Sequence, residues 1–307
     1  MNTSKLNNYN KEFLEENMMG PNSLLILEEM LDNMKKNSKL ELKSGMKVLD
    51  LGCGRGLTSI YLAKEYDVEV YALDLWIPAT DNHIRFKEME LEHKITPLCL
   101  DANKLPFADN YFDAIISIDS YHYFGNNDQF FNKTIKPILK KDALIGIAFP
   151  SIKHEFEFNN IPMEMKSFWQ EEAFNMWRST SWWINIFKNH LNNFEVHELK
   201  CFEQAWEDWL ILDNEYAIND REMMQADDGK YMNLISFTGT LTNEDEIIDN
   251  AKQQGFELGV EEGVKQGKFE EKLEIAINLL DVLDNETIAE KTGFSIPEID
   301  LLRQENK

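Results

Sequence analysis

Short apolar runs alternate with helix-like segments through the first half of the chain. Between the runs, residues 58–65 and 80–92 carry apolar positions at helical spacing. The runs themselves have the length and composition of buried β-strands, and they lie at residues 48–51, 68–73, 95–100, 112–118 and 143–149. Strands separated by helices predict an α/β fold with a doubly wound, mostly parallel sheet.

The segments on either side of this alternation complete the predicted domain. The first forty residues favour helices, one of them capped by Asn22 or Ser23. Residues 151–190 hold four tryptophans and no strand pattern, which predicts an aromatic-rich helical insertion that forms a substrate lid or, alternatively, a helical pair packed on the sheet. Two further strands, at 194–202 and 231–241, flank a helical piece, so we expect a seven-stranded sheet within a domain spanning 1–243.

The last part of the chain, residues 244–307, is acidic and helical in pattern. We expect a separate appendage that is either a solvated tail or a homo-oligomerisation or partner-docking arm, with the solvated tail favoured. Residues 284–299 resemble a helix-turn-helix, but their acidity argues against DNA binding.

Charge and composition exclude several classes of function. Thirty-one basic residues against 55 acidic ones give a net charge of −24, which disfavours nucleic acid and anionic membrane surfaces as partners. No run of apolar residues is long enough for a membrane span, and the N-terminus lacks the apolar core of a signal peptide, so we expect a cytoplasmic protein. Cys53, Cys99 and Cys201 fit no zinc spacing, and no metal is expected.

A glycine-rich turn, Gly52-x-Gly54-x-Gly56, follows the first predicted strand and precedes a helix. Glycines let the backbone approach a ligand closely, and a helix N-terminus offers free N–H groups. The spacing differs from the G-x-G-x-x-G of dinucleotide dehydrogenases. Asp50 at the strand end would suit an ammonium group and would be unfavourable beside a pyrophosphate. The turn therefore favours a ligand with an amino-acid tail, such as S-adenosylmethionine.

Two further acids close the next two strands. Asp74 ends the second strand, where a carboxylate can accept both hydroxyls of a ribose. Asp101, followed by Ala102, ends the third strand, where an acid can accept the amino group of an adenine. Asp74 as a plain helix cap and Trp76 as a core residue rather than an adenosine contact are the alternatives.

These motifs resemble the class I S-adenosylmethionine-dependent methyltransferases. Residues 48–56, 72–74 and 100–102 look like the first three motifs of the family, and residues 109–115 look like the approach to its fourth strand. Residues 18–22 and 119–125 are similar to a group of bacterial small-molecule methyltransferases. Residues 139–143 depart from the glycine-containing turn that is usual before the fifth strand.

The resemblance implies a cofactor, S-adenosyl-L-methionine, and a set of residues that bind it. These are Asp50, Gly52, Cys53, Gly54, Gly56, Asp74, Leu75, Trp76, Asp101, Ala102 and Asp119. Methyl transfer is a displacement in which positioning supplies much of the rate, and a base is needed only for a protonated nucleophile. His122, with Tyr121 beside it, is the expected catalytic base, because histidine titrates near neutrality. A histidine satisfied by backbone groups is the alternative.

We therefore expect a methyltransferase that acts on a small-molecule acceptor by in-line displacement. Aromatic residues among acids suit a cationic or an aromatic acceptor. Two other classes of protein remain: a nucleotide-dependent oxidoreductase, which the glycine spacing disfavours, and a non-catalytic S-adenosylmethionine-binding regulatory or interaction protein.

Overall fold

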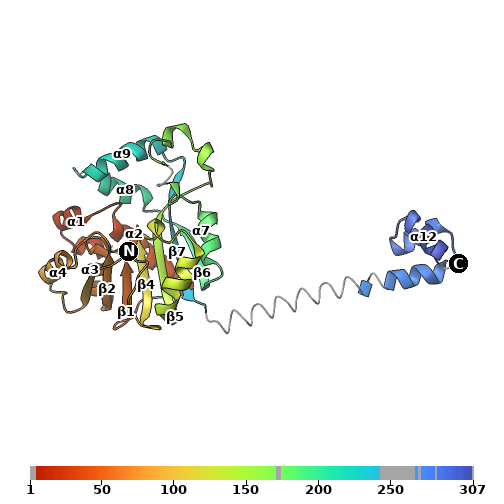
Figure 1. The fold of residues 1–307 in the computed structure, drawn as a ribbon, viewed down its shortest axis with the longest axis horizontal. Coiled ribbons are helices and arrows are strands. Elements are labelled where there is room, and N and C mark those ends of the chain that lie inside the picture. The colour runs from red at the N-terminus through yellow and green to blue at the C-terminus, as the bar shows by residue number, and fades with distance from the viewer. Residues whose placement is uncertain are drawn as a thin grey trace. The chain divides into compact units, whose positions relative to one another are not determined.

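The structure is a computed structural model that describes residues 5–170, 174–213, 215–242, 267–268, 271–280 and 282–305. The chain divides into two compact units, residues 1–243 and residues 244–307. The larger unit is an α/β domain built on one sheet (Figure 1).

A seven-stranded sheet of order β3-β2-β1-β4-β5-β7-β6 forms the centre of the larger unit. Its strands are β1 (Lys47–Leu51), β2 (Glu69–Asp74), β3 (Ile95–Cys99), β4 (Phe112–Ile118), β5 (Leu139–Ile152), β6 (Leu191–Glu198) and β7 (Met232–Leu241). β1 to β5 pair in parallel, and β7 runs antiparallel to both β5 and β6. The predicted mostly parallel sheet is confirmed.

Buried side chains on both faces hold the sheet between two hydrophobic cores. Successive residues of a strand point to opposite faces, so Val48 belongs to one core and Leu49 to the other. In β4, Ile116 and Ile115 divide in the same way. This double burial explains why the strands appear in the sequence as continuous apolar runs.

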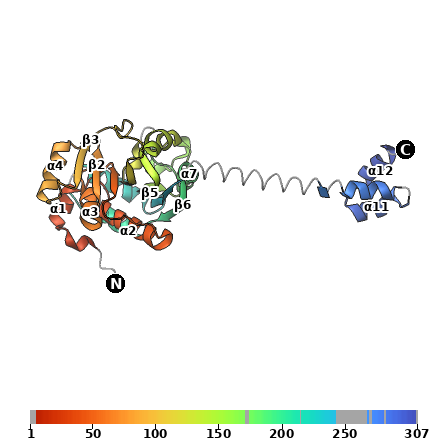
Figure 2. The same cartoon turned by 90° about the horizontal axis from the view of Figure 1, so that it is seen from below.

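Helices cover both faces of the sheet. The helices of the larger unit are α1 (Lys11–Asn17), α2 (Ser23–Asn33), α3 (Leu57–Tyr66), α4 (Ala79–Glu88), α5 (Asp128–Phe130), α7 (Thr180–Phe187), α8 (Phe202–Leu210) and α9 (Glu215–Asp227). α2 and α3 pack side by side on one face (Figure 2), whereas α7 packs on the other through Trp183 and Phe187. α8 and α9 lie together beyond one end of the strands (Figure 1).

Asp142 stands where the family pattern would have supplied a glycine, and it lies within β5. Asp142 adopts a left-handed backbone conformation with φ of 58°. Aspartate is one of the few residues besides glycine that tolerate this conformation. β5 begins at Leu139, four residues before the predicted strand, and its pairing with β4 is irregular between Phe112 and Ala114.

The smaller unit has a hydrophobic core of its own. A helical segment at 271–279, α11 (Asn285–Thr292) and α12 (Ile296–Glu305) enclose this core. It consists of Ala276, Leu280, Ile288 and Ile299. The glycines at 255, 259 and 263 lie outside the described residues.

Candidate cofactor pocket

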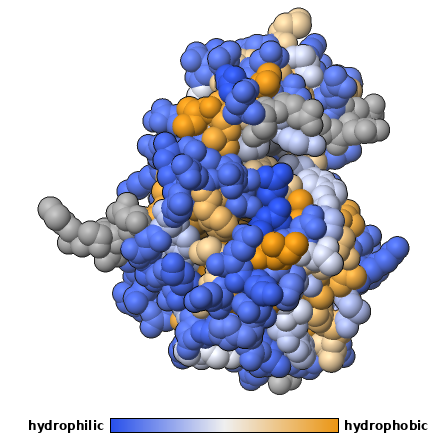
Figure 3. Space-filling view, turned by 90° about the vertical axis from the view of Figure 1, so that its left-hand side faces the viewer, coloured by the Kyte–Doolittle hydropathy of each residue, from blue (hydrophilic) through white to orange (hydrophobic). Residues whose placement is uncertain are grey.

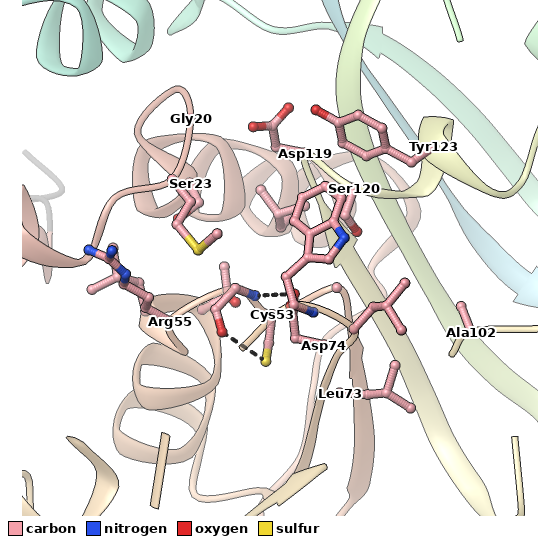
Figure 4. A pocket seen from close by; sticks show the side chains of 18 of the residues that line it. Gly20, Ser23, Cys53, Arg55, Leu73, Asp74, Ala102, Asp119, Ser120 and Tyr123 are labelled. Carbon is pink, nitrogen blue, oxygen red and sulfur yellow. Dashed lines mark hydrogen bonds between the residues drawn. The ribbon is translucent and has the colours of Figure 1, made fainter. Parts of the chain in front are cut away.

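A pocket of about 430 Å³ opens where β1, β2, β3 and β4 end (Figure 4). Its volume falls within the roughly 300–1,000 Å³ typical of small-molecule sites. Nine residues singled out from the sequence line it: Gly52, Cys53, Gly54, Asp74, Leu75, Trp76, Asp101, Ala102 and Asp119. The carboxyl ends of the parallel strands thus bring motifs that are far apart in the chain into one cavity.

The glycine turn forms the floor of this pocket. Gly52 has φ of +79°, and a Cβ atom there would lie 2.1 Å from Ser120 Oγ. The N–H groups of Gly52 and Cys53 both donate to the Leu73 carbonyl oxygen, at 2.8 and 2.9 Å. Glycine is therefore required at position 52 by backbone conformation and by the close approach of Ser120.

Asp74 ties the glycine turn to the end of β2. Its Oδ2 accepts a hydrogen bond from the Gly54 N–H at 2.9 Å, and its Oδ1 accepts from the N–H groups of Trp76 and Ile77 at 2.8 and 3.1 Å. The side chain is 7% exposed and lines the pocket. A carboxylate has about four acceptor sites, so Asp74 can still accept a hydroxyl from a ligand.

Asp101 and Trp76 both line the pocket. Asp101 Oδ1 accepts hydrogen bonds from the backbone N–H and side-chain amide of Asn103, which lower the pKa of the carboxyl group. Trp76 is 66% exposed and not a core residue, and its ring packs edge-on against Tyr123 with centroids 5.9 Å apart. The exposed ring is therefore free to contact a ligand.

Asp50 and Gly56 were expected to touch the cofactor, but the structure places both beneath the pocket lining. Asp50 is fully buried, and its Oδ2 accepts hydrogen bonds from the hydroxyls of Thr58 and Ser59 at 2.6 and 2.5 Å. Burial raises the pKa of Asp50 to about 6, although both hydrogen bonds oppose this shift. Gly56 caps α3 with φ of +83° and packs against Phe86. Neither residue is among those that line the pocket, although Asp50 Oδ1 has no hydrogen-bond partner, and their contact with the cofactor stays a prediction.

The predicted base also lies outside the pocket lining. The His122 ring is 2% exposed and is packed among aromatic rings, with the Tyr123 ring 4.1 Å and the Phe149 ring 5.5 Å away between centroids. Burial lowers the pKa of His122 to about 3. Tyr121 is fully buried in the core beside α7. This geometry supports a packing role for both side chains, and we assign neither as a base.

Tyr123 and Asp119 are instead the side chains that follow β4 into the pocket (Figure 4). Asp119 has φ of 54°, a left-handed conformation that turns the chain sharply at the end of the strand. Burial raises the pKa of Asp119 well above its usual range, and the charge of Asp220 adds to the shift. The polar group that reaches the cavity thus belongs to Asp119, three residues before the predicted base.

The sequence motifs gave little indication of the N-terminal wall of the pocket. Asn17, Met19, Gly20, Pro21 and Ser23 line it, from the loop between α1 and α2. A Cβ atom at Gly20 would lie 2.3 Å from Asp119 Oδ2, so this loop closes against the end of β4. Only the similarity of residues 18–22 to one methyltransferase group pointed to this segment.

The predicted lid, residues 151–190, contributes no described residue to the pocket lining. Trp169 and Trp183 are fully buried in the two cores instead. Within the described part of the chain, no group of three or more His, Cys, Asp or Glu side chains could hold a metal ion. None of the described helices is long and apolar enough to cross a membrane.

Comparison with known proteins identifies the domain that carries this pocket. Residues 48–142 match the sequence profile of a family described as "Methyltransferase domain". Phosphoethanolamine N-methyltransferase 3 of Arabidopsis thaliana is 37% identical over 103 residues, which are 32% of this chain and 20% of that protein. Sterol 24-C-methyltransferase of Aspergillus fumigatus is 31% identical over 110 residues, covering 36% of this chain and 29% of that protein. The aligned part is therefore less than a third of each of these relatives.

Solved structures show the same fold over a longer part of the chain. Phosphoethanolamine N-methyltransferase 2 of Haemonchus contortus, in complex with phosphomonomethylethanolamine and S-adenosylhomocysteine, superposes with a TM-score of 0.57. The superposition covers 74% of this chain and 55% of that one at 17% identity. Residues 48–142 thus form a methyltransferase domain, and the fold around them is that of the class I S-adenosylmethionine-dependent methyltransferases, as the sequence motifs predicted.

Proposed function

We propose that this protein transfers the methyl group of S-adenosylmethionine to a small-molecule acceptor. The observation that carries the proposal is the pocket itself, in which the glycine turn, Asp74, Asp101 and Asp119 meet in one cavity. The matched methyltransferase domain supplies the walls of this cavity from β1 to β4.

The residues present fit the proposed cofactor. Gly52 and Gly54 leave the floor of the pocket without side chains, so that the tail of the cofactor can lie against the backbone. Asp74 retains acceptor capacity for ribose hydroxyls, and Asp101 and Trp76 lie where an adenine can be held. Three carboxylates line the cavity, and Arg55 is the only Lys or Arg among its described lining residues. This balance favours a sulfonium cation over a pyrophosphate.

The chemistry that the bound cofactor supplies is an activated methyl group. The protein's own residues orient it: Asp74 fixes the turn on which the cofactor lies, and the loop at Met19 and Gly20 closes over the pocket beside Asp119. The pocket holds two reactants in contact away from bulk water, which is the main requirement of a direct displacement.

The relatives support a small-molecule acceptor but not a particular atom. Their names describe methylation of nitrogen in phosphoethanolamine and of carbon in a sterol. Free thiols at Cys53, Cys99 and Cys201 are consistent with a cytoplasmic location, which we propose as well.

A transfer experiment distinguishes an enzyme from a protein that only binds the cofactor. We would incubate the protein with methyl-labelled S-adenosylmethionine and a pooled small-molecule extract, and follow label in new products. Label should move to at least one compound, and Asp74→Ala should slow its appearance. Binding of S-adenosylhomocysteine without any transfer would favour the non-catalytic alternative.

A further inference from the structure

The part of the pocket beyond the glycine turn contains a carboxyl group without a partner. Asp119 lines the pocket, and its carboxylate has no hydrogen bond or ion pair within the described part of the chain. Asp119 is half-buried, and a carboxyl group with restricted access to water ionises more readily when a ligand supplies a donor or a cation beside it. Asp119 can therefore bind a hydrogen-bond donor or a cation that belongs to a ligand.

A second acidic side chain, Asp220, lies outside the pocket lining but acts electrostatically on Asp119. Asp220 on α9 is partly buried, and its Oδ2 accepts a hydrogen bond from Trp209 Nε1 at 2.7 Å. The charge of Asp220 reaches both Asp119 and Tyr123, and the pKa of each of these two residues is raised. Two acidic groups within electrostatic range of each other make this end of the pocket more favourable for a cation than for an anion.

Aromatic rings complete this half of the pocket. Tyr123 and Trp76 pack edge-on with centroids 5.9 Å apart, and both line the cavity. Ring faces next to a carboxylate are the usual surroundings of a bound ammonium group. In Figure 4 the Tyr123 side chain and the Asp119 carboxylate lie at the same end of the pocket.

The same half of the pocket offers little to an anionic group. Arg55, the single Lys or Arg among the described lining residues, lies at the opposite side from Tyr123 (Figure 4). The N-terminus of α2 also borders the pocket, at Ser23. However, the N–H groups of Leu24 and Leu25 are already bonded to Asn22 Oδ1. A phosphate beside Asp119 would find repulsion without a counter-charge.

We propose that the methyl acceptor is a small amine with a net positive charge and no phosphate group, and that its nitrogen binds beside Asp119 with Asp220 behind it. This inference rests on the proposed methyltransferase function. It separates the chain from the relatives named for phosphoethanolamine, whose substrate carries a phosphate. Hydrophilic residues cover most of the face shown in Figure 3, and the net charge of −24 favours the approach of a cation over that of an anion.

The reaction that follows balances as a simple displacement. The ammonium group of the acceptor gives one proton to the Asp119 carboxylate, which passes it to solvent. The freed lone pair on nitrogen forms a bond to the methyl carbon as the carbon–sulfur bond breaks. The electron pair of that bond stays on sulfur, and the positive charge moves from sulfur to the methylated nitrogen.

The charge of the labelled product tests the acceptor class before the acceptor itself is identified. Product formed from methyl-labelled S-adenosylmethionine and a pooled small-molecule extract is first separated from the unreacted cofactor, which is itself a cation, and is then passed at pH 7 over cation and anion exchangers. We expect the label on the cation exchanger, unchanged by phosphatase treatment. Label on the anion exchanger or in the neutral flow-through overturns the inference but leaves the proposed function intact. A complete lack of labelled product overturns both.

Three variants then test the two carboxylates against the purified acceptor. Asp119→Asn should lower kcat/KM about ten- to a hundredfold, since a charge-assisted contact is lost. Asp220→Asn should raise KM severalfold with kcat unchanged, the pattern expected for lost ground-state attraction. Glu222→Gln removes the same charge from an exposed position of α9 and should change neither constant. S-adenosylhomocysteine should bind the Asp220→Asn and Glu222→Gln proteins equally. Equal kinetics for Asp119→Asn and Glu222→Gln would exclude Asp119 as the amine-binding group.

Discussion

Asp74 Oδ2 accepts a hydrogen bond from the Gly54 N–H at 2.9 Å, and this contact joins the end of β2 to the turn that follows β1. The two segments are twenty residues apart, and each carries one of the motifs of the pocket. Asp74 also accepts hydrogen bonds from the N–H groups of Trp76 and Ile77, so a single carboxylate holds both the glycine turn and the segment that follows β2.

Replacement of Asp74 should weaken cofactor binding. Asp74→Ala removes a charge-assisted acceptor, which costs roughly 1.5–3 kcal/mol, or about ten- to a hundredfold in affinity for S-adenosylhomocysteine. Asp74→Asn keeps one acceptor oxygen and should lose less. Calorimetry on variants shown by circular dichroism to be folded makes the comparison. An unchanged dissociation constant for Asp74→Ala would mean that Asp74 serves only as a cap.

A comparison of Gly45 with Gly52 separates the cost of backbone strain from the cost of a close contact. Gly52 and Gly45 have φ of +79° and +80°, but a Cβ atom meets Ser120 at Gly52 and nothing within 4 Å at Gly45. Gly45→Ala should cost about 1–2 kcal/mol of unfolding free energy through strain alone. Gly52→Ala should cost more and should also abolish tight S-adenosylhomocysteine binding. Equal losses in both variants, measured by denaturant unfolding, would show that the Ser120 contact is unimportant.

Burial of Asp50 should make stability depend on pH in a defined direction. The pKa of Asp50 is raised from 3.8 to about 6 in the folded protein, so the unfolded chain loses this proton first as pH rises. The contribution of Asp50 is therefore most favourable below about pH 4 and is lost between pH 4 and 6. The loss is on the order of 3 kcal/mol.

Asp50→Asn isolates that contribution, because every other titrating group is common to the two proteins. The difference in unfolding free energy should shift in favour of Asp50→Asn as pH rises from 4 to 7. Parallel pH profiles for the two proteins would contradict the burial argument.

The cofactor end of the pocket could be predicted from the sequence because its parts are local. Gly52, Asp74 and Asp101 each follow a strand that appears as an apolar run, and parallel strands end at one edge. The pattern did not show where a side chain points. Asp50 alternates into the layer beneath the turn, and His122 turns into the aromatic core while Asp119 and Tyr123 reach the cavity.

The acceptor end depends on contacts between distant parts of the chain. Asp119 meets Gly20 and the charge of Asp220, although these residues lie about a hundred positions away on either side. The tryptophans of 151–190 are apolar enough for either a lid or a core, and composition alone does not decide between the two. Their burial in the structure assigns Trp169 and Trp183 to the core.

The C-terminal unit should be dispensable for cofactor binding. The pocket is lined by residues between Asn17 and Phe124, and none comes from residues 244–307 within the described chain. A chain that ends at Asn243 should bind S-adenosylhomocysteine with unchanged affinity. If the tail is an oligomerisation arm, light scattering should show a smaller mass. Loss of affinity in a folded truncated protein would place the domain boundary elsewhere.

Calorimetric titration with S-adenosylhomocysteine and with NAD tests the cofactor assignment most directly. Both ligands contain adenosine, but only NAD brings a pyrophosphate to the carboxylates and the glycine turn of the pocket. We expect saturable binding of one S-adenosylhomocysteine per chain and no response to NAD. Tight NAD binding together with no response to S-adenosylhomocysteine would contradict the assignment of this pocket to S-adenosylmethionine.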